Sequence, residues 1–564
     1  MGPGPKLFSR TDTETGFRVA VVGGGFGGIA AGVMLRRAGI EHFDIFERSA
    51  GVGGTWWDNR YPGAEVDTPS FIYSFSFDRY VWRRTHAQRE EIQEYLERTV
   101  DEQGLRQHLQ LGVTVDSAVW DDTRHEYDVS LADGRRLRYH ALISAVGFLN
   151  KPRMPSWPGA CRFNGQIVHT ALWPEALELA GKRVAVVGTG STSVQLVSEL
   201  APKVARLTVF QRQPNWVLPK GARDYTERER HRYRRPWRYW LAWARQFVKS
   251  ESGRFGGHEA TVGKGANRRR RDAALAHLRE QLEDRPDLLE LVTPDYPFFG
   301  KRPVINDTYY PALLRDNVTL VPHPVAAVDQ RGVTDSTGTC HEVDVVVAAT
   351  GFEAANYLSS LRITGRGGVD LHEHWNGEPE AFLGVMVPRF PNFFMLYGPN
   401  TNAGPVVLFL ECQARFAASC IRRAVRLGGA RVEVKTAWAS GYNRLLQRRL
   451  SSTVWGSTDN YFKSASGRVV TQWPSSASVY WLLARILRPL GTTYTRRSGA
   501  SHPRVSPSSP HEHSHTDPQH LDAVDDGSAV ETDHADGSVG QRWPDGFQLD
   551  VSGHGDPRPK RSRP

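Results

Sequence analysis

The chain has 564 residues, 40% hydrophobic and 23% charged, with a formal net charge of +10. One hydrophobic core cannot serve a chain of this length, so two or three folded units are expected. No apolar run reaches the roughly 18 residues of a membrane span and the N-terminus lacks an apolar signal core, which favours a cytoplasmic protein. The four cysteines lie far apart without a CxxC pair, which argues against a disulfide framework, a zinc site and a dithiol redox centre.

A strand, a glycine-rich turn and a helix follow one another near the N-terminus. The apolar run FRVAVV leads into Gly23, Gly25 and Gly28, a GxGxxG pattern, and a stretch with helical spacing follows. Glycine permits the tight turn and lets backbone N–H groups approach a pyrophosphate at the helix N-terminus. Glu47 ends the next strand, where a carboxylate accepts hydrogen bonds from a ribose diol. The segment is therefore predicted to bind a dinucleotide.

The same order of strand, turn and helix returns at GKRVAVVGTGSTSVQL. Ser193 replaces the third glycine, and a small residue there still allows close packing of helix against strand. No acid ends the following strand, where Arg212 stands instead; a cation suits a 2′-phosphate that an acid would repel, so NADPH is preferred over NADH. The predicted cofactor contacts of this turn are Gly188, Gly190, Ser191, Thr192, Ser193 and Gln195.

Two dinucleotide sites in one chain imply electron transfer between two cofactors, most simply NADPH and FAD. Because the chain has no CxxC pair, a disulfide-reductase reaction is excluded. The electrons must then pass to oxygen, to a quinone or to a partner protein.

Residues 221–299 break the alternation of strands and helices and are predicted to be a helical insertion. Most of the positive charge lies here, since residues 223–271 hold 15 Lys or Arg against 5 Asp or Glu. A competing hypothesis from another class makes this segment a module for an anionic membrane or a nucleic acid, because aromatic residues lie among the basic ones: Trp237, Tyr239, Trp240 and Trp243. Such aromatics more often pack a core or line a substrate route, so nucleic acid is not expected and membrane association is less favoured.

From about residue 497 the composition turns to Ser, Pro, His, Asp and Gly, which predicts a disordered tail. The run from His511 to His515 has three histidines, but in a polar tail without other ligands we interpret it as solvated. No metal site is predicted.

One motif resembles a known family. Residues 163–174 match FxGxxxHxxxWP, the fingerprint of Baeyer–Villiger monooxygenases, at every fixed position: Phe163, Gly165, His169, Trp173 and Pro174. A second family pattern also matches, with Gly53-Gly54-Thr55-Trp56, then Tyr61-Pro62-Gly63, then Asp67. Flavin-containing heteroatom oxygenases are similar but usually lack the Trp-Pro ending. The resemblance covers residues 17–485.

The resemblance implies an α/β fold with two Rossmann-like dinucleotide-binding domains, one for FAD and one for NADPH. The expected division is an N-terminal extension (1–16), an FAD-binding domain (17–155 and 352–496), an NADPH-binding domain (156–220 and 300–351), the helical insertion (221–299) and the disordered C-terminal tail (497–564).

The resemblance also implies roles for single residues. The segment GKRPVINDTYY makes Arg302 the active-site arginine, paired with Asp67, and brings Lys301 to the 2′-phosphate beside Arg212. Thr55, Trp56 and Asp67 are expected at the FAD cofactor. His169 lies in the linker between domains, where it is expected to govern their relative motion rather than to act as a base or a ligand.

The implied reaction uses NADPH, FAD and O2 to convert a ketone to an ester or lactone through a C4a-peroxide of the flavin. The alternative within the same chemistry is N- or S-oxygenation. No obligate protein partner is implied. Three departures from the family pattern affect the pocket and the cofactor grip rather than the reaction class: Gln213 for a threonine beside the phosphate-binding arginine, Asn460 for a tryptophan, and Val146 for the threonine of an ATG turn.

Overall fold

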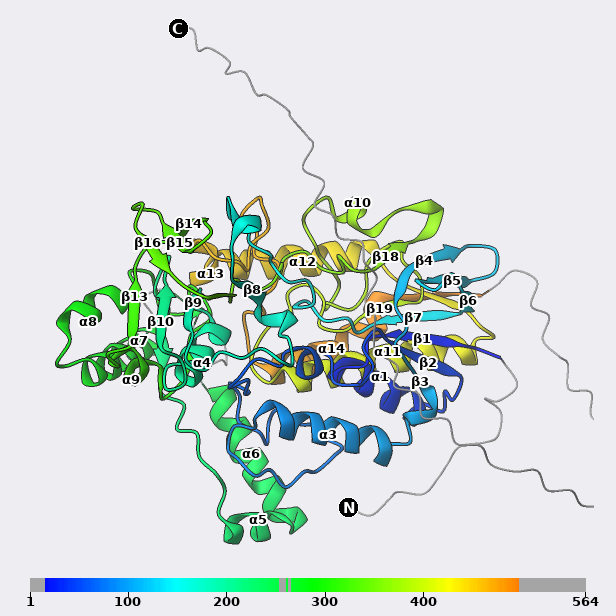
Figure 1. The fold of residues 1–564 in the computed structure, drawn as a ribbon. Coiled ribbons are helices and arrows are strands. Elements are labelled where there is room, and N and C mark those ends of the chain that lie inside the picture. Colours follow the sequence, from blue (N-terminus) through cyan, green and yellow to red (C-terminus); the bar gives the residue numbers. More distant parts are fainter. Residues whose placement is uncertain (1–15, 253–259, 262–264, 497–564) are drawn as a thin grey trace, which may run out of the picture. The chain divides into compact units, whose positions relative to one another are not determined.

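The computed structural model describes residues 16–252, 260–261 and 265–496, and two five-stranded parallel sheets form its centre (Figure 1). The first sheet has the order β19 (Phe393–Met395), β7 (Ala141–Ser144), β1 (Val19–Val22), β2 (Phe43–Glu47) and β3 (Leu109–Leu111). The second has the order β13 (Val318–Val321), β10 (Arg206–Phe210), β9 (Arg183–Val187), β17 (Val345–Ala348) and β8 (Gln166–His169). The expected α/β fold with two Rossmann-like units is confirmed.

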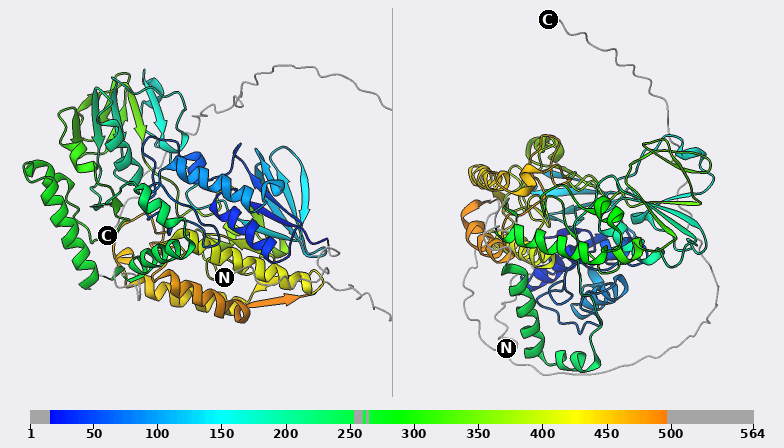
Figure 2. Two further views of the ribbon diagram at one scale, coloured as in Figure 1. Left: turned by 90° about the horizontal axis from the view of Figure 1, so that it is seen from below. Right: turned by 90° about the vertical axis from the view of Figure 1, so that its left-hand side faces the viewer.

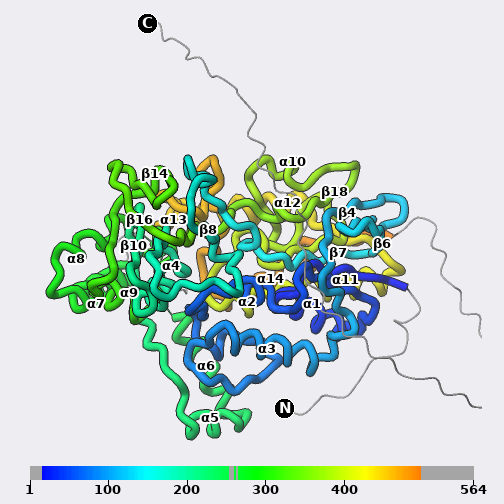
Figure 3. The backbone as a smooth tube through the Cα atoms, in the orientation of Figure 1, coloured from blue at the N-terminus to red at the C-terminus, as the bar shows by residue number. Residues whose placement is uncertain are grey.

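The first sheet draws strands from distant parts of the chain, and Figure 3 shows the late segments returning among the early ones. Its helices are α1 (Phe26–Arg37), α2 (Thr55–Asp58), α3 (Arg89–Glu102), α10 (Leu371–Trp375), α11 (Val406–Arg426), α12 (Thr436–Ser451), α13 (Val454–Ser457) and α14 (Ala477–Gly491). Two small sheets accompany them, one of β18 (Arg362–Thr364), β4 (Val115–Asp121), β5 (Glu126–Leu131) and β6 (Arg136–Tyr139), the other of β20 (Arg431–Val434) and β21 (Thr492–Thr495).

The second sheet carries α4 (Ser191–Leu200) and α9 (Tyr309–Leu313), with a three-stranded sheet of β14 (Val325–Val328), β15 (Gly332–Asp335) and β16 (Cys340–Glu342). The chain passes between the two large sheets twice, and the crossings run antiparallel. Arg153 donates its backbone N–H to Gly351 O at 2.8 Å, and Glu353 donates to Lys151 O at 3.1 Å. The two connections therefore form one hydrogen-bonded strap.

The predicted helical insertion is present. It leaves the second unit through β11 (Val217–Leu218), returns through the paired β12 (Val304–Ile305), and contains α5 (Glu227–Tyr233), α6 (Pro236–Ser252), α7 (Gly265–Gln281) and α8 (Pro286–Val292). On α6, Tyr239 is 1% exposed, and Trp240 and Trp243 pack against the core of the first unit. Only Trp237 among these four aromatic residues is largely exposed, at 61%. Three of the four thus serve the core.

Some expectations fall outside the described residues. The N-terminal extension and the tail with its His511–His515 run belong to this part of the chain. Within the described part, no helix is both long and apolar enough to cross a membrane, and no group of His, Cys, Asp or Glu could hold a metal ion.

A steric requirement distinguishes two glycines of the first turn. A Cβ at Gly28 would lie 1.8 Å from Gly23 O, whereas a Cβ at Gly25 would lie 3.4 Å from the nearest atom, Gly54 Cα. We expect Gly28→Ala to lower the thermal unfolding midpoint by roughly 5–10 °C, because helix and strand must separate. The unfolding is measured on the FAD-free protein, so that cofactor binding does not contribute to the midpoint. Gly25→Ala is then the matched control and should unfold within about 2 °C of the parent. Equal midpoints for all three proteins would contradict this steric account.

Candidate active site

The first glycine turn and Glu47 lie together at the carboxyl end of the first sheet. Gly23 adopts φ +111°, and a Cβ there would meet Ala145 O at 2.5 Å, so this position is restricted to glycine. Glu47 ends β2 as expected and is buried. Its carboxylate accepts hydrogen bonds from the backbone N–H of Gly24 at 2.7 Å and of Ser49 at 2.8 Å. The carboxylate is therefore fixed at the carboxyl end of the sheet, beside the turn.

Thr55 and Trp56 begin the short helix α2. Thr55 is exposed, while Trp56 is buried and donates its indole N–H to the hydroxyl of Tyr73 at 3.0 Å. Burial raises the pKa of Tyr73 to about 12, so this phenol stays neutral.

The second glycine turn meets the same steric demand with different residues. Gly188 has φ +128° and a Cβ there would lie 2.5 Å from Ala349 O, whereas no atom would lie within 4 Å of a Cβ at Gly190. Ser193, in the place of the third glycine, donates its hydroxyl to Gly188 O at 2.6 Å. The serine thus closes the turn through a hydrogen bond.

Helix α4 of the second unit holds a loop of the first. The Gln195 amide donates to Glu65 O at 3.0 Å and accepts from the Tyr61 hydroxyl at 2.9 Å. Thr192 also interacts with Tyr61, and Ser191 donates to Asp67 Oδ2 at 3.4 Å. Gln195, predicted as a cofactor contact, therefore uses both ends of its amide within the protein.

Arg302 and Asp67, far apart in sequence, lie in contact. Arg302 Nη2 is 3.2 Å from Asp67 Oδ2; the Arg302 side chain is 51% exposed and that of Asp67 is 11% exposed. Burial opposes the charge of Arg302, but Asp67 and nearby tyrosines outweigh it and raise the pKa of the guanidinium. A permanent positive charge therefore lies where loops of the two units meet.

Three tyrosines surround this pair, and the sequence analysis missed all of them: Tyr73, Tyr397 and Tyr461. The hydroxyls of Tyr73 and Tyr397 stay neutral because burial raises each pKa, whereas Tyr461 is 47% exposed. Tyr397 adopts φ +60° and its hydroxyl donates to Asn402 at 2.8 Å. No periodicity or spacing marks these residues, because they come from three separate loops.

Arg212, Lys301 and Gln213 gather beyond the end of β10. Arg212 is exposed, and Lys301 donates to the side-chain carbonyl of Gln213. Burial and then the neighbouring Arg212 lower the pKa of Lys301. Gln213 also donates to Asp295 Oδ1 at 3.1 Å. The two cations predicted to act together are thus close enough to repel each other, which an anion between them would relieve.

His169 ends β8, an edge strand of the second sheet, and lies beside the strap. Its Nδ1 accepts the backbone N–H of Ala171 at 3.1 Å, and its ring lies edge-on to Phe352 at 6.3 Å. Burial lowers the pKa of His169, so the imidazole is neutral near pH 7. It does not contact Arg302 or Asp67 among the hydrogen bonds of the described residues.

A second ion pair joins the two units close by. Lys220 Nζ is 2.7 Å from Glu65 Oε1, and the side chains are 1% and 15% exposed. Three backbone N–H groups, from Lys220, Gly221 and Ala222, donate to Asp307 and fix the lysine segment. Sequence offered no signal for this pair, since its members are 155 residues apart.

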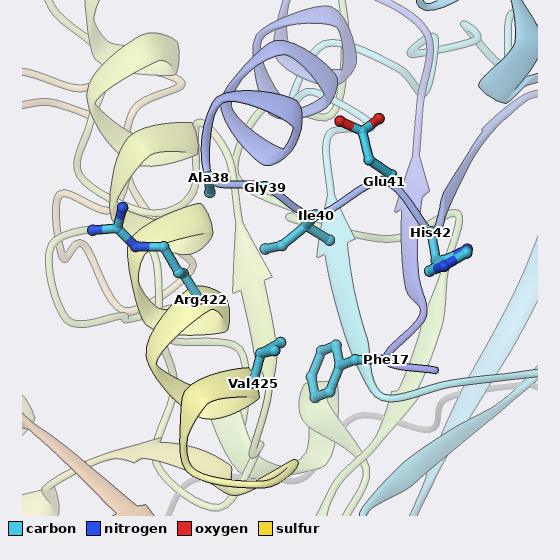
Figure 4. A pocket seen from close by; sticks show the side chains of 8 residues that line it. All are labelled: Phe17, Ala38, Gly39, Ile40, Glu41, His42, Arg422 and Val425. Carbon is cyan, nitrogen blue, oxygen red and sulfur yellow. The ribbon is translucent and has the colours of Figure 1, made fainter. Parts of the chain in front are cut away.

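The small hollow in Figure 4 lies elsewhere. Its volume is about 20 Å³, room for about one water, and Phe17, Ile40 and Arg422 are among its lining residues. Phe17 precedes β1, whereas nucleotides bind beyond the carboxyl ends of parallel strands. The hollow is therefore at the wrong end of the sheet for a cofactor.

Two glycine turns stand at the carboxyl ends of two parallel sheets, and an arginine–aspartate contact joins loops of the two units. This arrangement defines an oxidoreductase with two dinucleotide sites. The family model for pyridine nucleotide-disulphide oxidoreductases matches residues 20–226. A Baeyer–Villiger monooxygenase of Pseudomonas aeruginosa is 36% identical over 463 residues, which cover 81% of this chain and 87% of that protein. The chain belongs to the Baeyer–Villiger monooxygenase family.

Two solved structures agree with this assignment. The closed crystal structure of cyclohexanone monooxygenase is 30% identical, with a TM-score of 0.77, and the match covers 85% of this chain and 99% of that one. Oxidized steroid monooxygenase bound to NADP is 29% identical, with the same TM-score and the same coverage.

The buried pair should contribute more stability than an exposed one. Lys220→Met leaves Glu65 buried without its partner, which typically costs about 3–5 kcal/mol. Lys203, paired with Glu199 on the surface at 3.2 Å, provides the control, and Lys203→Met should cost less than about 0.5 kcal/mol. Chemical unfolding of both variants measures the difference; a loss in Lys220→Met no larger than in the control would show that the pair is not structural.

Proposed function

We propose that the chain uses NADPH, FAD and O2 to convert a ketone to an ester or lactone. The Arg302–Asp67 contact at 3.2 Å between loops of the two units carries this proposal. In the overall reaction one oxygen atom enters between the carbonyl carbon and a neighbouring carbon. The other oxygen atom leaves as water, with two electrons and a proton from NADPH and a second proton from solvent.

The residues of the first turn fit FAD. The absence of a side chain at Gly25 would let the pyrophosphate approach the backbone, and Glu47 is held beside the turn. Asp67 Oδ1 is buried and has no hydrogen-bond partner among the described residues, so it remains available as an acceptor. Gly23, Gly25, Gly28, Glu47 and Asp67 would hold this cofactor, with Thr55 and Trp56 at the start of α2.

The residues of the second turn fit NADPH. The space beyond Gly190 admits a pyrophosphate, and Arg212 with Lys301 offers two positive charges to the 2′-phosphate. Gln213 keeps Lys301 in place through its side-chain carbonyl. Gln195, Thr192 and Ser191 would act on this site indirectly, by holding the loop that carries Asp67.

When bound, the reduced flavin supplies the activation of O2. Arg302 contributes a fixed positive charge that stabilises negative charge on the oxygen attacking the carbonyl carbon. Its guanidinium does not release a proton near neutral pH, so it favours the anion without protonating it. Asp67 orients Arg302 and balances its charge. This arrangement favours attack on a carbonyl over N- or S-oxygenation, which needs an electrophilic oxygen.

His169 suits a positioning role in this scheme. Its imidazole is neutral and buried, so it adds no charge to the site. It packs beside the strap, where a relative motion of the two units would bend the chain. We therefore propose that His169 acts in the linker between the units and not as a base.

Cofactor choice provides the first test. Removing one charge that faces the 2′-phosphate should weaken NADPH binding by roughly 1.5–3 kcal/mol, a factor of about ten to a hundred in affinity. NADH binding should be nearly unchanged, because NADH has no 2′-phosphate. Arg212→Ala should therefore lower the preference for NADPH over NADH, measured as the ratio of kcat/KM for the two cofactors. Arg206, exposed at the start of the same strand, is the control, and Arg206→Ala should change neither value. Equal losses with both cofactors in Arg212→Ala would make that arginine structural.

The second test separates cofactor binding from oxygen transfer. Arg302→Ala should retain FAD, because both glycine turns are intact, but ester formation should fall by roughly 10²–10³. NADPH oxidation should continue with its electrons recovered as H2O2, and ester, H2O2 and NADPH are measured together. Arg285→Ala removes an exposed arginine paired with Asp287 at 2.7 Å and should leave the ester yield unchanged. An unchanged ester yield per NADPH in Arg302→Ala would remove this residue from the active site.

A further inference from the structure

Helix α14 exposes an apolar face on the outside of the first unit. Leu482, Ile486 and Leu490 recur every four residues and are 50%, 48% and 47% exposed. Trp481, beside them, is 39% exposed. The opposite side of the helix packs against α11, with Tyr480 buried (Figure 2). The helix is therefore apolar on both sides, which packing among the described residues does not explain. We call Trp481, Leu482, Arg485, Ile486 and Leu490 the α14 face.

Positive charge accompanies this face. The Arg485 guanidinium lies over the Trp481 ring at 4.0 Å, and α14 contains Arg488 but no acidic residue. On the adjoining α11, Arg415 and Arg423 are exposed, and the one acidic residue, Glu411, is buried.

Arginines of the two helices act on the same two buried cysteines of α11. Burial raises the pKa of the Cys412 thiol to about 12, and Arg415 of α11 and Arg485 of α14 both oppose that rise. Burial likewise raises the pKa of Cys420 to about 11, and Arg488 of α14 and Arg423 of α11 both oppose it. Arginines from both helices thus lie close to the contact between α11 and α14, next to the α14 face.

We infer that the α14 face docks on the surface of an anionic lipid bilayer. Tryptophan and aliphatic side chains enter the boundary between headgroups and acyl chains, while arginines pair with anionic headgroups and extend along their own apolar stems. The helix would lie in the plane of the interface, and the remainder of the chain would stay in water.

A second copy of the chain fits this face poorly. In a two-fold symmetric dimer the same patch meets itself, so Arg485 and Arg488 of one copy would approach the same cations of the other. No acidic residue on α14 would compensate, and like charges across an interface disfavour association. An anionic lipid surface removes this repulsion.

Vesicle co-sedimentation of the full-length holoprotein tests the inference. We expect binding to phosphatidylcholine vesicles that contain phosphatidylserine, weaker binding to phosphatidylcholine alone, and a decrease with added salt. The double variant Leu482→Glu/Ile486→Glu should lower the partition coefficient by about tenfold or more. Leu314, 40% exposed on the second unit, is the control, and Leu314→Glu should bind like the parent.

Flavin content, thermal unfolding and turnover of a water-soluble ketone should be unchanged in the double variant, which separates lost docking from lost folding. Three outcomes would overturn the inference: no vesicle binding by the full-length protein, equal binding by parent and double variant, or a parent dimer that the double variant abolishes while vesicle binding persists.

Discussion

The loop at residues 61–67 links the two nucleotide-binding units, and the arrangement of the active site depends on it. Its backbone pairs with residues 87–89 of the first unit, whereas three of its side chains contact the second: Tyr61 with Gln195, Glu65 with Lys220, and Asp67 with Arg302. Two of these contacts are ion pairs: Glu65–Lys220 is nearly buried, whereas Arg302 of the Asp67–Arg302 pair is about half exposed. The buried pair fixes the loop, while the open pair keeps its positive charge accessible to a reacting group. A change in the relative position of the two units would therefore alter the contact of Arg302 with Asp67.

The two glycine turns solve one steric problem in two ways. In both, the first glycine has positive φ and lies against a backbone carbonyl of a neighbouring segment. At the third position the first turn needs Gly28, since any Cβ would strike Gly23 O. The second turn has Ser193 there, and its hydroxyl donates to Gly188 O. A Cβ at the middle glycines would not clash, since at Gly25 it would only contact Gly54 Cα at 3.4 Å and at Gly190 no atom lies within 4 Å. Their requirement comes from a ligand and not from the fold.

The departures from the family pattern have structural partners. Gln213 bonds Lys301 and Asp295, so it connects the phosphate-facing lysine to a carboxylate. Asn460 closes its own loop by donating to Trp455 O at 3.0 Å and Thr458 O at 2.8 Å. Val146 packs against a hydrophobic cluster of the first unit. In the structure each replacement makes contacts within the protein, which supports a change of local packing without a change of reaction class.

The sequence alone determined the elements and the class of chemistry. Strand, glycine turn and helix are local features, and each depends on residues within about thirty positions, so the two units, Glu47 at a strand end and the cation after β10 could all be predicted. The pairing of Arg302 with Asp67 came from family resemblance, because no local pattern joins residues 235 positions apart. Only the tertiary structure decided that Gln195 serves a loop, that three tyrosines surround the arginine, and that Lys220 meets Glu65. These contacts form where separate loops meet, because the two units pack against each other. No periodicity in the sequence predicts which loops will meet.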